Sequence, residues 1–237
     1  MNTAVAVVTI SLLSFALSAG LGVIIVPWLH KLKFGQTILD IGPNWHKQKQ
    51  GTPTMGGFMF IIASLVAFIA VVLIDHFMGG DIVAGTSPVP DIEKVKLYAG
   101  LIMALGFGII GFFDDYIKVV KKQNEGLTVL QKSVAQVVLS LAYIITMVRV
   151  TDQFMYIPFV GNVGYGSPII FGVFAFIVIY ATVNAVNFTD GIDGLCASVT
   201  VTASAAFAVA AVLREAVGVS LAACALAGAC AGYLIWN

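Results

Sequence analysis

The stretch MGGFMFIIASLVAFIAVVLIDHFM, residues 55–78, carries a single acidic or basic side chain apart from one histidine. A helix needs about 20 mostly apolar residues to cross the hydrocarbon core of a membrane, and it satisfies its own backbone hydrogen bonds there. Six other stretches have the same character, and we expect seven spans at residues 4–26, 55–78, 97–113, 133–148, 167–186, 195–213 and 216–236. These runs lack the alternation of a membrane β-barrel. The sequence therefore predicts an all-α polytopic transmembrane helix bundle, residues 1–237, as a single integral membrane domain.

The composition of the chain excludes several other classes of protein. Of the 237 residues, 59% are hydrophobic and 10% are charged, whereas soluble domains are about a quarter charged. The formal net charge is zero, which argues against a nucleic acid as partner, because such proteins need a basic surface. The three cysteines lie in apolar stretches and predict no disulfide framework.

The positions of the basic residues predict how the chain crosses the membrane. No Lys or Arg precedes the first span, which argues against a cleavable signal peptide. Segments 27–54, 114–132 and 187–194 hold eight of the twelve basic residues, so the positive-inside rule places them in the cytoplasm and the N-terminus outside.

The first of three polar clusters is GPNWHKQKQGTPTMGG, residues 42–57. Its glycines and prolines predict turns, and its Gly56-Gly57 pair allows close approach of a ligand or a helix. Lys49 and Thr54 supply a cation and a hydroxyl donor, both suited to a phosphate. The alternative is a turn with lysines that reach the membrane surface and glycines that serve only packing.

The second cluster is GFFDDYIKVVKKQNEGLTVLQK, residues 111–132. Asp114 and Asp115 end an apolar run, where two carboxylates need a metal ion or other cations. Neighbours on a helix diverge by about 100°, so both face one point only if the helix has ended there. Lys118 lies within reach of either aspartate, and simple neutralisation of the acids by Lys118 is the alternative.

The third cluster is NAVNFTDGIDG, residues 184–194. Asn187, Asp190 and Asp193 recur every three residues, which places them along one side of a helix, and Gly191 leaves room for a bulky ligand. Acids at the end of a membrane span are costly unless they bind something. A calcium loop is excluded because its remaining ligands are missing.

Together the clusters combine oxygen ligands suited to Mg²⁺ with lysines suited to phosphate. This combination indicates phosphoryl chemistry with a water-soluble substrate from the cytoplasm and a lipid phosphate from the bilayer. A secondary transporter is a weaker alternative, since its charged sites lie nearer mid-membrane.

These motifs, in this order, resemble the signatures of the bacterial phospho-N-acetylmuramoyl-pentapeptide transferases (translocase I), which are polyprenyl-phosphate N-acetylhexosamine-1-phosphate transferases. The resemblance implies a Mg²⁺-dependent reaction in which UDP-N-acetylmuramoyl-pentapeptide and undecaprenyl phosphate give lipid I and UMP. This is the first membrane step of peptidoglycan synthesis, and so of the cell-wall biogenesis that underlies cell shape and cell division. A sister transferase that uses UDP-N-acetylglucosamine is the closest alternative.

The resemblance also assigns roles to individual residues. It implies that Asp114, Asp115 and Asp190 are catalytic and that Asp115, Asn187 and Asp190 hold the metal. It implies that the substrates bind at Lys49, Thr54, Lys118, Lys132, Asn187, Gly191, Ile192 and Asp193.

The resemblance further implies the bacterial inner membrane, with the active site facing the cytoplasm, contacts with membrane lipids and a homodimer. The full family fold has about ten spans, one further metal-binding aspartate and a His-rich loop. The corresponding positions lie beyond Asn237, so we expect the 237 residues alone to be nearly inactive.

Overall fold

The structure, a computed structural model, describes residues 1–31, 55–85, 87–121, 123, 125–151, 155–157, 159–163 and 166–237. Within these ranges the elements are α1 (Thr3–Lys31), α2 (Gly57–Phe77), α3 (Pro90–Lys121), α4 (Val129–Val150), β1 (Met155–Ile157), β2 (Gly161–Val163), α5 (Pro168–Thr189), α6 (Leu195–Leu213) and α7 (Val217–Tyr233). The two strands form a short antiparallel pair between α4 and α5, with Tyr156 opposite Asn162.

The predicted all-α membrane bundle is confirmed. Helices α1 to α6 are each long and apolar enough to cross a membrane. Helix α7 is also apolar and has 17 residues, at the lower limit of about 17–25 residues for a span. The seven predicted apolar stretches thus each correspond to a helix.

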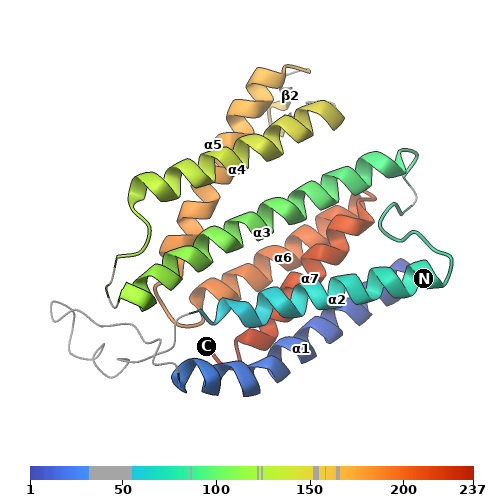
Figure 1. Cartoon of the computed structure of the whole chain (residues 1–237). Helices are drawn as coiled ribbons and strands as arrows, with labels where there is room; N and C mark the ends of the chain where they lie inside the picture. The colour runs from blue at the N-terminus through green and yellow to red at the C-terminus, as the bar shows by residue number, and fades with distance from the viewer. Residues whose placement is uncertain are drawn as a thin grey trace.

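The helices run alternately between the two ends of the bundle (Figure 1). At one end α1 finishes, α2 begins, α3 connects to α4, and α5 connects to α6. We call this the motif end, because the described parts of all three polar clusters lie there. The cytoplasmic location of this end remains a prediction.

Helix α7 lies inside the bundle and packs against α1, α2, α3 and α6. Gly228 and Gly232, four residues apart, face α1 so closely that a Cβ atom at either position would collide with a backbone carbonyl of Ser11 or Phe15. Small residues at this spacing let membrane helices approach closely. The best-packed part of the bundle is built from α1, α2, α6 and α7. By contrast, α5 has no buried side chain and packs mainly on α4.

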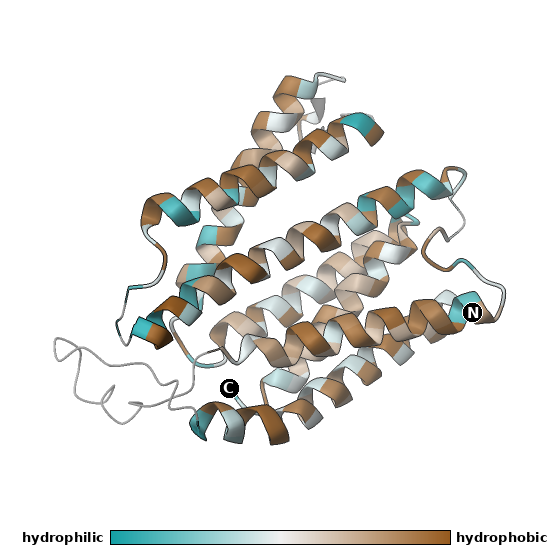
Figure 2. Cartoon of the chain, in the orientation of Figure 1, coloured by the Kyte–Doolittle hydropathy of each residue, from teal (hydrophilic) through white to brown (hydrophobic). Residues whose placement is uncertain are grey.

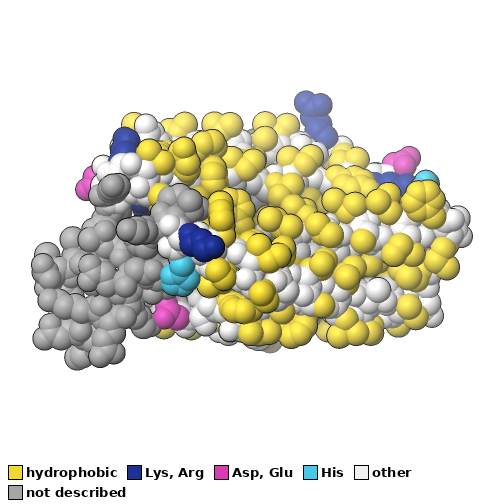
Figure 3. Space-filling view, turned by 60° about the horizontal axis from the view of Figure 1, so that its bottom comes forward, with side chains coloured by type: hydrophobic (Ala, Val, Ile, Leu, Met, Phe, Trp, Pro, Cys, Tyr) yellow, Lys and Arg dark blue, Asp and Glu magenta, His cyan; other side chains and the backbone are white. Residues whose placement is uncertain are grey.

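The surface of the bundle matches a membrane environment. Hydrophobic residues cover the middle of the helices, and hydrophilic residues gather at their ends (Figure 2). In Figure 3 the face over α1 and α2 is mostly hydrophobic, with the charged side chains placed toward its ends. A broad apolar belt between two polar ends is what a bilayer requires.

Four helices, α1, α3, α4 and α5, extend beyond a predicted end. Helix α3 continues to Lys121 instead of ending near residue 113, so it contains Asp114, Asp115 and Lys118. The apolar run ends at residue 113, but ion pairs from Lys118 to both aspartates support the following turn.

Helix α4 begins at Val129 because Thr128 and Gln131 form a capping box at its N-terminus. Likewise α5 continues to Thr189 and contains Asn187. The predicted loop segments 114–132 and 187–194 are thus partly helical.

Candidate active site

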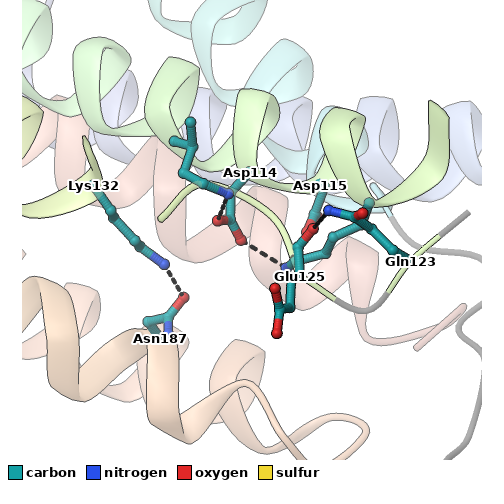
Figure 4. Close-up of polar contacts among 8 residues, drawn as sticks. Asp114, Asp115, Gln123, Glu125, Lys132 and Asn187 are labelled. Atoms are coloured by element: carbon teal, nitrogen blue, oxygen red, sulfur yellow. Dashed lines mark hydrogen bonds and ion pairs between the residues drawn. The ribbon is translucent and has the colours of Figure 1, made fainter. Parts of the chain in front are cut away.

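Asp114 is a buried carboxylate that ties the end of α3 to the start of α4. Its Oδ2 lies 2.6 Å from Nζ of Lys118, and its Oδ1 accepts a hydrogen bond of 3.0 Å from the backbone N–H of Leu127 (Figure 4). Gly126 allows this contact, because a Cβ atom there would lie 2.5 Å from Oδ1 of Asp114 and 2.6 Å from its carbonyl oxygen. Asp114 therefore fixes the connection between the two helices.

Asp115 is more exposed than Asp114 and has a different environment. Its Oδ1 lies 3.0 Å from Nζ of Lys118, which thus bridges both aspartates. Since α3 continues past both residues, their side chains diverge, as expected for neighbours on a helix. Both carboxylate oxygens of Asp114 are bound by protein groups, Lys118 and the backbone of Leu127. Asp115 keeps more of its surface available to a ligand.

Asp190 caps the C-terminus of α5 and lies near Asp115. Its side chain keeps an exposed surface, but partial desolvation and the negative charge of Asp115 raise the pKa of the Asp190 carboxyl. Within the described ranges, no Lys or Arg forms an ion pair with Asp190. Asp115 and Asp190, from different helices, thus lie close enough to repel each other, and Lys118 pairs with Asp115 but not with Asp190.

Lys132 and Asn187 join the second cluster to the third. Nζ of Lys132 donates a hydrogen bond of 3.0 Å to Oδ1 of Asn187 across the start of α4 and the end of α5 (Figure 4). Lys132 also lies close enough to Asp114 to attract it electrostatically. The two clusters therefore form one polar site, although 55 residues separate Lys132 from Asn187 in sequence.

The rest of the third cluster forms the turn into α6. Gly191, Ile192 and Asp193 are exposed at the motif end, where a ligand can reach them. The turn finishes at Gly194, which has a φ of +75° and precedes α6. This left-handed conformation favours glycine.

Only the end of the first cluster falls within the described residues, and Lys49 and Thr54 lie outside them. Gly56 packs against Tyr233, since a Cβ atom at Gly56 would lie 2.7 Å from the Tyr233 hydroxyl. The Tyr233 hydroxyl is also close enough to Asp190 and Asp193 to interact with them electrostatically. The start of α2 and the end of α7 therefore adjoin the third cluster.

The sequence interpretation missed several residues of this region. Gln136 of α4 and Asn184 of α5 form a side-chain hydrogen bond one helical turn from Lys132 and Asn187. Their spacing gave a signal: Gln136 follows Lys132 by four residues, and Asn184 precedes Asn187 by three. Gly126 had no comparable signal, because its role depends on the position of Asp114.

The predicted metal ligands fit a divalent cation by chemistry. The described candidates include four carboxylates, Asp114, Asp115, Asp190 and Asp193, against two lysines, Lys118 and Lys132. No group of three or more His, Cys, Asp or Glu is arranged for a metal in the described part of the chain. Asp115 and Asp190 nevertheless supply the oxygen donors that Mg²⁺ prefers, and the acidic excess favours a cation. The amide oxygen of Asn187 accepts one hydrogen bond from Lys132 and keeps its second lone pair for a cation.

The arrangement combines acidic and basic groups at the end of a membrane bundle. Lys118 and Lys132 can attract phosphate groups, while Asp115 and Asp190 can hold a cation between themselves and those groups. The apolar belt places this site next to lipid. Such a site suits the joining of a water-soluble phosphate compound to a lipid phosphate.

A family model and individual relatives both assign the chain to the same family of transferases. Residues 97–237 match the family described as glycosyl transferase family 4. The chain is 39% identical over 234 residues to the phospho-N-acetylmuramoyl-pentapeptide-transferase of Desulforudis audaxviator and 40% identical over 230 residues to that of Heliobacterium modesticaldum. It is 36% identical over 225 residues to the protein of the same name from Bacillus thuringiensis.

These alignments cover 94% of this chain in each case. They cover 66%, 65% and 64% of the three relatives, so the chain spans just under two thirds of their length. The resemblance inferred from the three motifs is confirmed.

Proposed function

The chain belongs to glycosyl transferase family 4, and on that basis we propose that it takes part in transferring phospho-N-acetylmuramoyl-pentapeptide from its UDP donor to undecaprenyl phosphate. The products are lipid I and UMP, and the location is the cytoplasmic face of the bacterial inner membrane. The observation that carries the proposal is the hydrogen bond from Lys132 to Asn187, because it brings the second and third motifs into one site beside lipid. The names of the relatives support this choice of substrates.

In the proposed reaction an oxygen of undecaprenyl phosphate attacks the β-phosphorus of the donor. The bond from that phosphorus to the bridging oxygen breaks, and UMP leaves with the electron pair. A phosphate monoester has a second pKa of about 6, so the attacking group is largely deprotonated at neutral pH and needs no strong base. Lys118 and Lys132 stabilise the negative charge on the diphosphate.

The carboxylates have separate roles in this scheme. Asp115, Asp190 and Asn187 would hold Mg²⁺, which when bound neutralises negative charge on the diphosphate. Asp114 fixes the α3–α4 connection through Leu127 and orients Lys118, so we assign it a positioning role. A two-step route, in which an aspartate attacks first, is distinguished by UMP release in the absence of lipid acceptor.

The choice of donor is tested by assaying the full-length protein that carries these residues, in membranes, with either of two UDP-sugars. We expect UMP release that depends on undecaprenyl phosphate with UDP-N-acetylmuramoyl-pentapeptide and not with UDP-N-acetylglucosamine. The opposite preference would assign the chain to the sister transferases. Accumulation of an unmodified solute in vesicles, without UMP, would favour a transporter. Inactivity of the 237 residues alone remains a prediction for the same assay.

Removal of divalent cations is expected to abolish this activity, and Mg²⁺ is expected to restore it. The physical reason is the acidic excess at Asp115 and Asp190, which repels a diphosphate unless a cation lies between them. A cation bound to the folded protein also raises the melting temperature. Full activity after exhaustive chelation, with no effect of Mg²⁺ on melting, would contradict the metal site.

A further inference from the structure

Polar side chains join α4 to α5 about one helical turn further from the motif end than the hydrogen bond from Lys132 to Asn187. Nδ2 of Asn184 donates hydrogen bonds to Oε1 of Gln136, at 3.2 Å, and to the carbonyl oxygen of Tyr180, at 2.8 Å. The hydroxyls of Ser133 and Tyr180 lie 3.1 Å apart. We call these four side chains, from Ser133, Gln136, Tyr180 and Asn184, the α4–α5 seam.

The seam lies within two helices that are long and apolar enough to span the membrane. Gln136 is only 2% exposed, and a buried amide away from water is costly unless it forms hydrogen bonds. Residues that serve only to fill an apolar bundle need no such groups. The presence of an amide pair at this depth therefore calls for a specific role.

Apolar contacts such as that of Gly172 with Ile144 also join α5 to α4, but they are shallow. Helix α5 has no buried side chain, and its contact with α6 is slight. Hydrogen bonds between membrane helices stabilise their association modestly and specify which residues face each other. The hydrogen bonds described between α5 and α4 are those of the seam and the one from Lys132 to Asn187.

The seam is next to the hydrogen bond from Lys132 to Asn187 along both helices. Gln136 follows Lys132 by four residues and Asn184 precedes Asn187 by three, so each pair shares a helix face. A four-residue step on a helix is about 6 Å along its axis. A shift of α5 at Gln136 and Asn184 would therefore carry Asn187 away from Lys132 and Asp190 away from Asp115.

We infer that Gln136 is a positioning residue, which acts through Asn184 to hold Lys132 and Asn187 at the separation that the bound diphosphate requires. Gln136 itself contacts no substrate. The inference rests on the proposed function, but it concerns a residue that belongs to none of the three motifs.

The test is Gln136→Leu in the full-length protein, a change that suits the apolar surroundings and leaves the bond from Asn184 to Tyr180 in place. We expect kcat to fall about tenfold or more, because small misplacement of binding groups is costly in catalysis, while KM for undecaprenyl phosphate changes little. The reciprocal swap Gln136→Asn with Asn184→Gln keeps the combined reach of the pair and should restore most of the activity. Thr146→Val is the matched control, since the hydrogen bond described for the Thr146 hydroxyl stays within α4, to the carbonyl oxygen of Ala142.

Two further measurements separate positioning from simple loss of stability. In a Lys132→Ala background, Gln136→Leu should have little further effect on kcat. The effects of two substitutions that act through the same group do not add. Independently of activity, cysteines placed at 132 and 187 in a cysteine-free background should cross-link readily, and Gln136→Leu should slow this reaction.

Unchanged kcat together with unchanged cross-linking in Gln136→Leu would overturn the inference. Failure of the proposed function would look different, as absence of UMP release from the unmodified protein. Even in that case, slower cross-linking would support the positioning by Gln136, and an unchanged rate would refute it.

Discussion

Asp190→Asn is expected to lower kcat of the full-length protein by about a thousandfold, because it removes a charge that holds the cation where negative charge develops in the reaction. Asparagine has nearly the same shape as aspartate. In addition, Asp190 is exposed and forms no ion pair among the described residues, so the bundle should stay folded. The measurement is the steady-state rate of UMP release, with the melting temperature as the check on folding.

The matched control for this change is Glu125→Gln. Glu125 is another exposed carboxylate at the motif end, in the connection between α3 and α4, but it has no assigned role. Its neutralisation should change kcat by no more than about twofold, since screened surface charges contribute little. Similar losses in both variants would mean that the general acidity of this end matters, rather than a specific site at Asp190.

Gly126→Ala is expected to reduce both stability and activity. The new Cβ atom would lie 2.5 Å from Oδ1 and 2.6 Å from the carbonyl oxygen of Asp114, too close for either atom. Since the carbonyl belongs to α3, the α3–α4 connection must move, and Asp114 loses its hydrogen bond from Leu127. Overpacking of this kind costs about 1–3 kcal/mol, and displacement of Lys118 should lower kcat/KM by about tenfold or more.

Gly111→Ala is the control for Gly126→Ala. Gly111 lies in α3, three residues before Asp114, and a Cβ atom there meets nothing within 4 Å. Alanine at this position should leave activity intact and stabilise the helix by up to about 1 kcal/mol. Thermal unfolding in detergent and the UMP assay distinguish the two variants. Equal behaviour would show that Asp114 does not depend on close approach by Gly126.

The fold was predictable from sequence because hydrophobicity decides which segments lie in a membrane. Each of the seven apolar stretches corresponds to a helix. The helix ends were less predictable, since α3 continues through a polar turn held by Lys118, Asp114 and Asp115. The capping box at Thr128 and Gln131 is a local sequence signal for the start of α4 that the hydropathy pattern does not use.

The candidate site was predictable as three motifs, but its internal contacts were not. The acids and amides of the third cluster stood out because polar groups at a span end are costly. The hydrogen bond from Lys132 to Asn187, and that from Gln136 to Asn184, depend on how α4 packs against α5. That packing involves residues about 50 positions apart, which no local pattern in one sequence specifies.

The decisive measurement follows the β-phosphorus of the donor. UDP-N-acetylmuramoyl-pentapeptide labelled at that phosphorus is incubated with undecaprenyl phosphate and membranes that contain the full-length protein. Transfer of a phospho-sugar requires that the label enter the lipid fraction in step with UMP release, and that both depend on Asp190. Label that stays in the water-soluble fraction, or that leaves as UDP, would contradict phosphoryl transfer at this site.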